Sequence, residues 1–376
     1  STNTFGANEL KLESTGFSVE EIIDSAVKIA QEAREDKNVY IALDVGPIGH
    51  LLEPMGTLSF ERAYEIFKRQ VVQGEKSGAD LILLETMTDL YETKAALLAV
   101  KENTNLPVFC TMSFEENGRT FTGCTQESMA ITLEGLGADA VGVNCSLGTK
   151  ELMPIVKRII SSTNLPVMTQ PNAGLPKISF GETVYDITVD EFSSWIKKFV
   201  DEGVSIIGGC CGTTPDFIKA LREIADNNKR VQREKVNFSA VCTPSKIVKI
   251  EGVKVIGERI NPTGKKIFKE ALKNNDLDYV LKQAIEQVEA GAEILDVNVG
   301  APEVDEKEMM LKVIKEIQSI IDAPLQIDSS YPDIIEAGLR KYNGKPIVNS
   351  VNGEDEVLDK ILPVVKKYGA SVVGLT

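Results

Sequence analysis

The chain has 376 residues, and its 41 Lys and Arg against 56 Asp and Glu give a formal net charge of −15. This acidic balance argues against nucleic acid or an anionic membrane surface as the main partner. No apolar run reaches the roughly 18 residues of a membrane span, so we expect no membrane association of that kind. The chain begins with Ser1, without Met and without a signal-like segment, so we expect a piece of a longer chain.

The numbers of histidines and cysteines limit which metal sites and catalytic groups the chain can form. The single histidine, His50, makes a metal site with two or three histidines impossible within this chain. A Ser-His-Asp or Cys-His catalytic arrangement would have to use His50 itself. Six cysteines are too few for a disulfide scaffold, so we expect a reducing, cytoplasmic setting.

Short β-branched segments alternate with longer helical patterns along most of the chain. The first group of predicted strands covers residues 39–45, 79–86, 107–114, 138–146, 166–171 and 204–211. After a polar segment, the rhythm resumes at 255–259, 292–299, 324–328, 346–351 and 370–375. Each interval holds one helix, which is typical of repeated βα units around a parallel sheet.

The strand count predicts the fold class. A closed (βα)8 barrel needs eight strands and about 250 residues, whereas fewer strands lie on each side of the polar segment. We predict an α/β protein with two tandem (βα)8 TIM-type barrels, the first lacking its leading strands and the second truncated after about five strands. The predicted domains are residues 1–228 and 255–376, with an inter-domain linker at 229–254. An open doubly wound sheet is the competing fold, but no G-x-G-x-x-G fingerprint follows a predicted strand.

Three cysteines lie where predicted strands end. Cys145 closes one strand, and Cys210 and Cys211 lie in the segment GGCCGTTP at 208–215. Because the C-terminal strand ends form the catalytic face of a βα barrel, the three sulfurs could meet there. Neighbouring cysteines on a regular strand point to opposite faces, so the backbone must leave strand geometry, with the flanking glycines supplying the freedom. Three thiolates suit zinc and leave a fourth position open, although buried cysteines are often simply small apolar residues.

Several segments then carry a resemblance. VNCS at 143–146, PNAG at 171–174 and GGCCGTTP at 208–215 closely resemble the zinc-dependent homocysteine S-methyltransferase family. GERINPTG at 257–264, LDVN at 295–298 and VNS at 348–350 resemble the pterin-binding barrel of methyltetrahydrofolate methyltransferases. In this order, the two halves are similar to the N-terminal half of cobalamin-dependent methionine synthases over essentially the whole chain.

The resemblance implies a methyltransferase that makes methionine from homocysteine. Cys145, Cys210 and Cys211 would hold Zn²⁺, and the sulfur of homocysteine would take the fourth position. Zinc deprotonates a bound thiol, so the metal would replace a general base. Glu85 is placed to receive the homocysteine ammonium, with a helix-capping carboxylate as an equal alternative. Asn172 would contact zinc or substrate, and Ser146 would support a ligand or serve only as a turn residue.

The second barrel, by the same resemblance, binds 5-methyltetrahydrofolate as the methyl donor. The residues that match the family's pterin-binding positions are Asn261, Asp296, Asn298, Asp328 and Asn349. The methyl group would reach homocysteine through methylcobalamin, carried by a corrinoid-binding domain or protein outside this chain. A network of amides and carboxylates around the pterin N5 is expected, because N5 must be protonated before its methyl group leaves.

Two alternatives remain open at this point. One is a homocysteine S-methyltransferase that uses another methyl donor or corrinoid protein. The other is a non-catalytic scaffold in which the zinc is structural. A nucleotide-binding oxidoreductase would need a phosphate-binding loop, and the sequence contains none that we recognise.

Overall fold

The computed structural model describes residues 1–179 and 182–376 of the chain. The chain divides into two compact units. The first consists of Ser1–Glu134 and Ala138–Val236, and the second of Gly135–Gly137 and Asn237–Thr376. Each unit is an α/β structure built on its own parallel sheet, which confirms the predicted α/β class.

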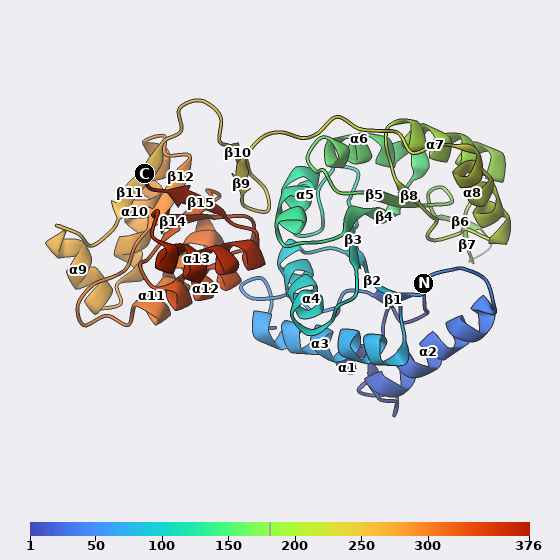
Figure 1. Ribbon diagram of the computed structural model, residues 1–376, viewed down its shortest axis with the longest axis horizontal. Coiled ribbons are helices and arrows are strands. Elements are labelled where there is room, and N and C mark those ends of the chain that lie inside the picture. Colours follow the sequence, from blue (N-terminus) through green and yellow to red (C-terminus); the bar gives the residue numbers. More distant parts are fainter. Residues whose placement is uncertain (180–181) are drawn as a thin grey trace. The chain divides into compact units, whose positions relative to one another are not determined.

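Six parallel strands form the sheet of the first unit, in the order β1-β2-β3-β4-β5-β8 (Figure 1). Their bounds are β1 Ala42–Val45, β2 Leu81–Met87, β3 Val108–Met112, β4 Ala140–Gly148, β5 Val167–Asn172 and β8 Ile206–Ile207. The spatial order follows the chain order, as βα units connected in sequence require. The prediction for 204–211 is wrong in extent, because the chain leaves the strand geometry after Ile207.

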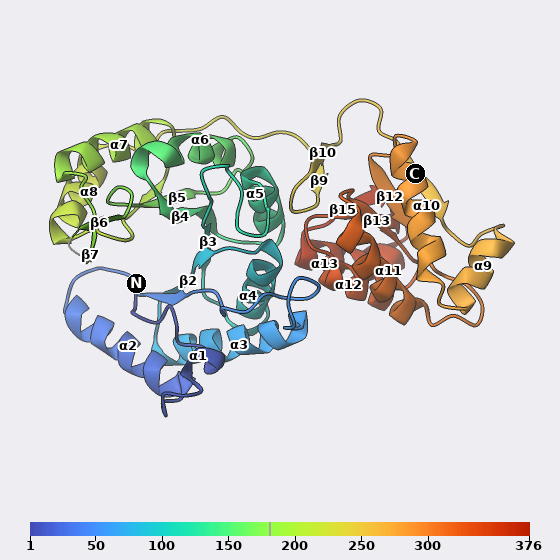
Figure 2. The same ribbon diagram turned by 180° about the vertical axis from the view of Figure 1, so that it is seen from behind.

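Helices lie on the convex side of this sheet, as Figure 1 and Figure 2 show from opposite directions. They are α1 Glu9–Leu12, α2 Val19–Arg34, α3 Phe60–Ser77, α4 Leu90–Asn103, α5 Gln126–Gly135, α6 Thr149–Ile160, α7 Val189–Asp201 and α8 Pro215–Asn227. In α7, Thr188 caps the first turn by accepting the backbone N–H of Glu191. Phe192, Ile196 and Phe199 are then buried along one face, each contributing about 1.5–3 kcal/mol by leaving water.

The sheet of the first unit is strongly curved. The Gln170 side chain on β5 donates from Nε2 to Glu85 Oε1 on β2 at 3.0 Å, although two strands separate β5 from β2 in the sheet. Asn144 on β4 similarly reaches Thr86 on β2. A flat sheet would hold such side chains about 10–15 Å apart, because neighbouring strands are about 4.8 Å apart. The concave face therefore brings the strand ends to a common centre.

A short hairpin, which the sequence did not lead us to expect, follows β5. It consists of β6 Lys177–Ser179 and β7 Glu182–Val184, paired antiparallel. An ion pair between Lys177 and Asp186 lies at its base. The hairpin brings Tyr185 beside the cysteine loop, where its ring lies against Gly212.

The second unit repeats the βα pattern with five parallel strands in chain order. They are β11 Ile256–Ile260, β12 Ile294–Val297, β13 Leu325–Asp328, β14 Ile347–Val351 and β15 Ser371–Gly374. Their helices are α9 Lys266–Lys273, α10 Leu277–Glu289, α11 Glu306–Ile320, α12 Pro332–Lys341 and α13 Asp355–Tyr368. All five predicted strands are present in this unit.

The segment before β11 packs within the second unit. It forms an antiparallel pair, β9 Ala240–Cys242 and β10 Ile247–Lys249. Cys242 also exchanges backbone hydrogen bonds with Lys345, at 2.9 and 3.0 Å. Val241 and Val248 are buried with Ile294 and Ile347 of the sheet. Residues 237–254 of the predicted linker are therefore an ordered part of this unit.

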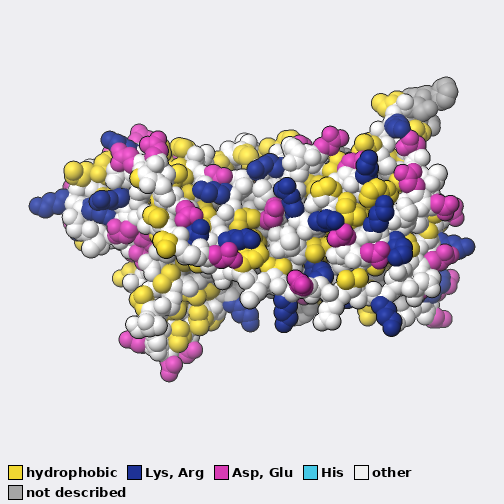
Figure 3. All heavy atoms as spheres, turned by 90° about the horizontal axis from the view of Figure 1, so that it is seen from above, with side chains coloured by type: hydrophobic (Ala, Val, Ile, Leu, Met, Phe, Trp, Pro, Cys, Tyr) yellow, Lys and Arg dark blue, Asp and Glu magenta, His cyan; other side chains and the backbone are white. Residues whose placement is uncertain are grey.

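Charges of both signs are mixed on one face of the protein. On the face drawn in Figure 3, basic and acidic side chains alternate, with apolar side chains between them. Among the residues that the structure describes, no helix is both long enough and apolar enough to cross a membrane.

Candidate functional site

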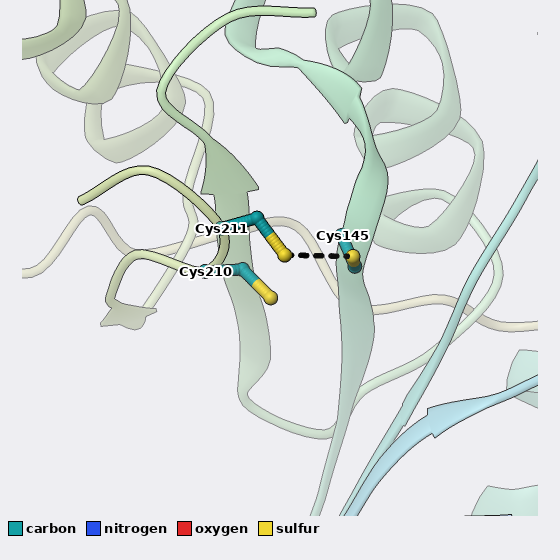
Figure 4. A group of neighbouring side chains, drawn as sticks. All are labelled: Cys145, Cys210 and Cys211. Carbon is teal, nitrogen blue, oxygen red and sulfur yellow. Dashed lines mark hydrogen bonds between the residues drawn. The ribbon is translucent and has the colours of Figure 1, made fainter. Parts of the chain in front are cut away.

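The structure brings Cys145, Cys210 and Cys211 together at the C-terminal ends of strands in the first unit. Their sulfur atoms all lie within 4.8 Å of one another, and Cys145 Sγ is 3.7 Å from Cys211 Sγ. Figure 4 shows the side chains of Cys210 and Cys211 extending from their loop toward Cys145 on the neighbouring segment. Cys145 and Cys210 are half-buried, whereas Cys211 is exposed. A small molecule from solvent can therefore reach the group.

A local distortion of β4 directs Cys145 into this group. The β4–β5 register is regular up to Asn144 and resumes only at Gly148. Between these points, Cys145 and Ser146 adopt φ values of 58° and 54°, in the left-handed region that non-glycine residues rarely occupy. Such strained residues concentrate at functional sites, where the surrounding contacts hold them.

The loop after β8 positions the other two cysteines. Cys210 N–H donates to Pro171 O at 3.0 Å, and Ala173 N–H donates to Cys211 O at 2.9 Å, so the loop continues alongside β5. Only Gly212 uses a positive φ, of 79°. Gly208 and Gly209 are needed for space instead, since a Cβ atom would lie 2.8 Å from Gln170 and 2.4 Å from Thr213 respectively.

Two asparagines hold the cysteine segments in place. Asn172 Oδ1 accepts the backbone N–H of Cys211 at 3.1 Å, and Asn172 is almost fully buried. Asn144 accepts from the backbone N–H of Thr86 at 2.9 Å and donates from Nδ2 toward Cys210 Sγ at 3.8 Å. Thr86 also has a positive φ, of 57°, so this hydrogen bond supports a further strained residue. The asparagines thus orient both cysteine segments.

Hydrogen bonds among the three thiols shift their pKa values in different directions. A hydrogen bond from Cys210 is the largest cause that lowers the pKa of Cys145 to about 5, and Ser146, Cys211 and Asn172 contribute in the same direction. The pKa of Cys210 is raised, because it donates to Cys145 and is desolvated. Desolvation also raises the pKa of Cys211. The group therefore favours one thiolate, and a metal ion bound there would require the other two thiols to lose their protons as well.

One sulfur–sulfur distance matches that of a tetrahedral zinc site, and all three sulfurs lie within 4.8 Å of one another. With zinc–sulfur bonds of about 2.3 Å, two ligands of a tetrahedral site are about 3.8 Å apart. The 3.7 Å between Cys145 and Cys211 agrees with that value without any movement. Thiolates are the ligands that zinc prefers, and three protein ligands leave a fourth position for a substrate.

Carboxyl and amide groups lie beside the cysteines on the concave face. Glu85, on β2, interacts electrostatically with Cys145 and Cys210 and bonds to Gln170. Desolvation raises its pKa. Asp44, on β1, hydrogen-bonds to Glu85; burial first, and then repulsion from Glu85, raise the pKa of Asp44 to about 8.

The remaining predicted residue of this unit is Ser146. It is exposed, and its hydroxyl forms a short hydrogen bond with that of Ser113 on the neighbouring segment. Its backbone N–H hydrogen-bonds to the sulfur of Cys145. Ser146 thus contacts a cysteine of the group through its main chain.

In the second unit, four of the five predicted pterin residues lie at the C-terminal ends of β12, β13 and β14. Asn298 Nδ2 donates to Asp328 Oδ2 at 3.0 Å, and Asp296 accepts hydrogen bonds from Gln326 and Asn349. Desolvation raises the pKa of Asp296 to about 6 and also raises that of Asp328. Asp296 is buried and the other three residues are half-buried, and together they form a donor and acceptor surface.

The side chain of Asn261, the fifth predicted residue, forms a hydrogen bond within its own turn. Its Oδ1 accepts the backbone N–H of Thr263 at 2.9 Å, which closes a turn after β11. Glu258, which the sequence analysis did not single out, lies near enough to Asp296 and Asp328 to raise the pKa of each. Lys265 pairs with Glu258 at 3.0 Å.

Sequence reasoning also missed Asp44, Asn144 and Gln170 in the first unit. Each is a polar residue within a largely buried strand, and each is at most 8% exposed. A carboxyl or amide in such a strand is itself a signal, because a buried polar group needs a partner. The identity of the partner depends on the curvature of the sheet.

Comparisons with known proteins agree with this geometry. The family model described as Homocysteine S-methyltransferase matches residues 1–225, and the one described as Pterin binding enzyme matches residues 257–376. The chain is 30% identical over 396 positions to a protein named methionine synthase from Mycobacterium tuberculosis, and 29% identical over 401 positions to one from Mycobacterium leprae. All of this chain is covered in both cases, but it spans only 33% of the length of each relative.

A solved structure has the same fold as more than half of this chain. The metallated form of a homocysteine methyltransferase from Escherichia coli superposes with a TM-score of 0.51 at 20% identity. The match covers 59% of this chain and 77% of that one. Since the family model covers more than half of the chain, the conclusion on family is direct. The chain belongs to the homocysteine S-methyltransferase family.

Proposed function

We propose that the first unit binds zinc through Cys145, Cys210 and Cys211 and activates homocysteine for methylation. The observation that carries this proposal is the convergence of three sulfurs within 4.8 Å, with one pair at the separation of a zinc site. When bound, zinc lowers the pKa of a coordinated thiol, so that homocysteine is a nucleophilic thiolate at neutral pH. No histidine base is needed, in keeping with the single, exposed His50.

The residues of the chain around the sulfurs would bind and orient the amino acid. Glu85 would accept the ammonium of homocysteine, because its carboxylate lies near Cys145 and Cys210 on the same concave face. Asn172 would hold the cysteine loop in register, since its oxygen binds the main chain of Cys211. The methyl group would then form a bond to the homocysteine sulfur as its bond to the donor breaks.

The second unit, in this proposal, binds 5-methyltetrahydrofolate. The polar edge of the pterin would form hydrogen bonds with Asp296, Asn298, Asp328 and Asn349. Asn261 would shape the adjoining turn. The connected carboxylates and amides support this role, because a pterin ring presents both donors and acceptors. The raised pKa of Asp296, about 6, would allow it to hold a proton near the ring at slightly acidic pH.

The methyl route extends beyond this chain. We propose that a corrinoid, as methylcobalamin on another segment or protein, carries the methyl group between the two units, as the name methionine synthase of the longer relatives suggests. Each sheet would then be part of a (βα)8 barrel, with residues 1–228 and 255–376 as the two functional domains; of the connecting residues 229–254, those from Asn237 onward pack with the second unit. The free cysteines suit a reducing, cytoplasmic setting.

Zinc stoichiometry tests the metal site. The wild-type chain should bind one zinc ion, and Cys210→Ala should lose it or bind it far more weakly. Cys242→Ala, which removes a buried thiol from the second unit, is the matched control and should retain full stoichiometry. Equal zinc content in all three proteins would sink the proposed ligand set.

X-ray absorption separates catalysis from a structural role. Adding homocysteine to zinc-loaded protein should raise the number of sulfur neighbours of the metal by one. A site that stays unchanged at saturating homocysteine would point to a scaffold with structural zinc. The rates of methyl transfer to homocysteine from methylcobalamin and from other methyl donors are then compared to identify the donor.

A further inference from the structure

The β6–β7 hairpin places the side chain of Tyr185 against the cysteine loop. A Cβ atom at Gly212 would lie 2.4 Å from Tyr185 Cγ and 2.5 Å from Cδ2, so the phenol ring packs on the main chain directly after Cys211. The hydroxyl of Tyr185 forms a hydrogen bond with the sulfur of Cys211. The other two sulfurs are near enough to interact electrostatically with the phenol. Tyr185 is therefore beside the candidate metal centre without being one of its predicted ligands.

Contacts at the base of the hairpin hold Tyr185 in this place. Lys177 and Val184 are paired in register across the hairpin. The Lys177 ammonium forms an ion pair with Asp186, the residue after Tyr185. Gly174 lies beside Asp186, since a Cβ atom at Gly174 would be 3.5 Å from Asp186 Oδ1. The residues on both sides of Tyr185 are therefore fixed, and its phenol is directed to the cysteine loop.

Tyr185 supplies one of the hydrogen-bond donors that surround the three sulfurs. Cys145 accepts a main-chain N–H, and Asn144 Nδ2 donates toward Cys210 Sγ at 3.8 Å. A phenol keeps its proton at neutral pH, so the Tyr185 O–H donates and the sulfur of Cys211 accepts. Cys211 is the exposed cysteine of the three, so Tyr185 serves the sulfur that is most open to solvent.

A donor to a metal-bound thiolate has two effects. It fixes the direction of the sulfur, as groups that support metal ligands generally do. It also engages a lone pair of the sulfur, which makes that sulfur a weaker nucleophile. Three cysteine thiolates and a substrate thiolate on one zinc ion are chemically alike, so the methyl group reaches the substrate only if the protein sulfurs react more slowly. Cys211 depends most on such protection, because reagents in solvent reach it most easily.

We propose that Tyr185 is a positioning residue of the metal centre, whose O–H holds the Cys211 sulfur toward the metal and lowers the reactivity of that sulfur toward methyl donors. The inference rests on the proposed function, because it assumes that the three cysteines bind zinc. It adds to that function a residue that protects a protein ligand, so that the substrate sulfur is the one methylated.

The first test removes only the hydroxyl. Tyr185→Phe keeps the ring that packs on Gly212, and Tyr40→Phe, at a tyrosine that is 75% exposed, is the matched control. Zinc affinity, measured by competition with a chelator, should fall about 10-fold in Tyr185→Phe and stay unchanged in Tyr40→Phe. In cobalt-substituted protein, the sulfur-to-cobalt charge-transfer band should move to longer wavelength in Tyr185→Phe, because a thiolate without the hydrogen bond gives up electron density more easily.

The second test measures the reactivity of each sulfur. When zinc-loaded protein is treated with iodomethane, a sulfur lone pair forms the S–C bond, and iodide leaves with the electrons of the C–I bond. Peptide mass spectrometry gives the methylation rates of Cys145, Cys210 and Cys211 in one sample. In Tyr185→Phe, Cys211 should be methylated about fivefold faster than in the wild type, the factor expected for one lost hydrogen bond. The other two rates are internal references and should stay the same.

Each result decides between the hypotheses. If the wild-type chain binds no zinc, the proposed function fails, and the role of Tyr185 fails with it. If zinc binds but Tyr185→Phe matches the wild type in affinity, spectrum and Cys211 methylation, the role of Tyr185 is overturned while the metal site stands. Equal acceleration at all three cysteines would mean a loosened loop and would overturn the assignment to the hydroxyl. A loss of zinc in Tyr185→Leu but not in Tyr185→Phe would assign the effect to ring packing instead.

Discussion

Asn172 Oδ1 accepts the backbone N–H of Cys211 at 3.1 Å, and this hydrogen bond connects the end of β5 to the loop that carries two of the three sulfurs. Asn172 is buried, and it also hydrogen-bonds to the Cys145 sulfur. One side chain therefore contacts both segments of the candidate metal centre.

Replacing Asn172 by Ala should weaken zinc binding without abolishing it. Groups that orient metal ligands typically contribute 10- to 100-fold in affinity, so a loss of about that size is expected. Competition with a chromophoric chelator measures it. Asn172→Asp keeps the acceptor oxygen and should recover part of the affinity, whereas Asn105→Ala, at an exposed position, should have no effect. Unchanged affinity in Asn172→Ala would contradict the orienting role.

A methyl group at Gly212 should disrupt the cysteine loop. Gly212 has a φ of 79°, and a Cβ atom there would lie 2.4 Å from the ring of Tyr185. Gly123→Ala is the matched control, because Gly123 has a φ of 89° but no atom within 4 Å of the added Cβ. Both variants incur backbone strain of about 1–2 kcal/mol, and only Gly212→Ala should also lose zinc. Equal zinc binding by both variants would show that Tyr185 moves aside without consequence.

Asp44 should make the first unit less stable at high pH. Its folded-state pKa is raised to about 8, against an unfolded value of about 3.9, because burial and Glu85 disfavour the ionised form. Stability from the protonated form is complete below about pH 4 and is lost as the pH rises through about 8.

Asp44→Asn should therefore raise the thermal midpoint at pH 8 and reduce the fall between pH 5 and pH 8. An effect of about 1–2 kcal/mol is expected, which is the usual size for a single substitution at a buried polar group. Scanning calorimetry of the whole chain measures it, and Glu92, whose pKa is raised to about 7, contributes equally to both proteins. Parallel pH curves for the two proteins would refute this prediction.

The second unit should lose pterin affinity when Asp328 is replaced by Ala. Asp328 accepts from Asn298 at 3.0 Å, and removing it leaves the amide without its acceptor as well as deleting a carboxylate from the surface. Loss of a charged hydrogen bond costs about 1.5–3 kcal/mol, or about 10- to 100-fold in the Kd for methyltetrahydrofolate. Quenching of protein fluorescence reports binding. The exposed carboxylate on α12 provides the control Asp333→Ala, and equal affinities would argue against a pterin site at Asp328.

Regular patterns in the sequence determined the repeated architecture of this protein. Short β-branched segments alternating with helical patterns predicted the eleven parallel strands seen among the described residues and their sequential connection, because local periodicity is a property of neighbouring residues. The cysteines could be singled out for the same reason, since strand ends in βα units share one face. The sequence patterns did not predict the hairpin of β6 and β7, or that residues 237–254 pack within the second unit.

Only the tertiary structure decided which polar groups meet. Gln170 and Glu85 lie on strands that are not neighbours, and their contact depends on the curvature of the whole sheet. The turn of Cys145 toward Cys211 likewise coincides with a register shift between β4 and β5. Such contacts are set by the packing of residues far apart in the chain, and no local pattern of hydrophobic and polar residues encodes them.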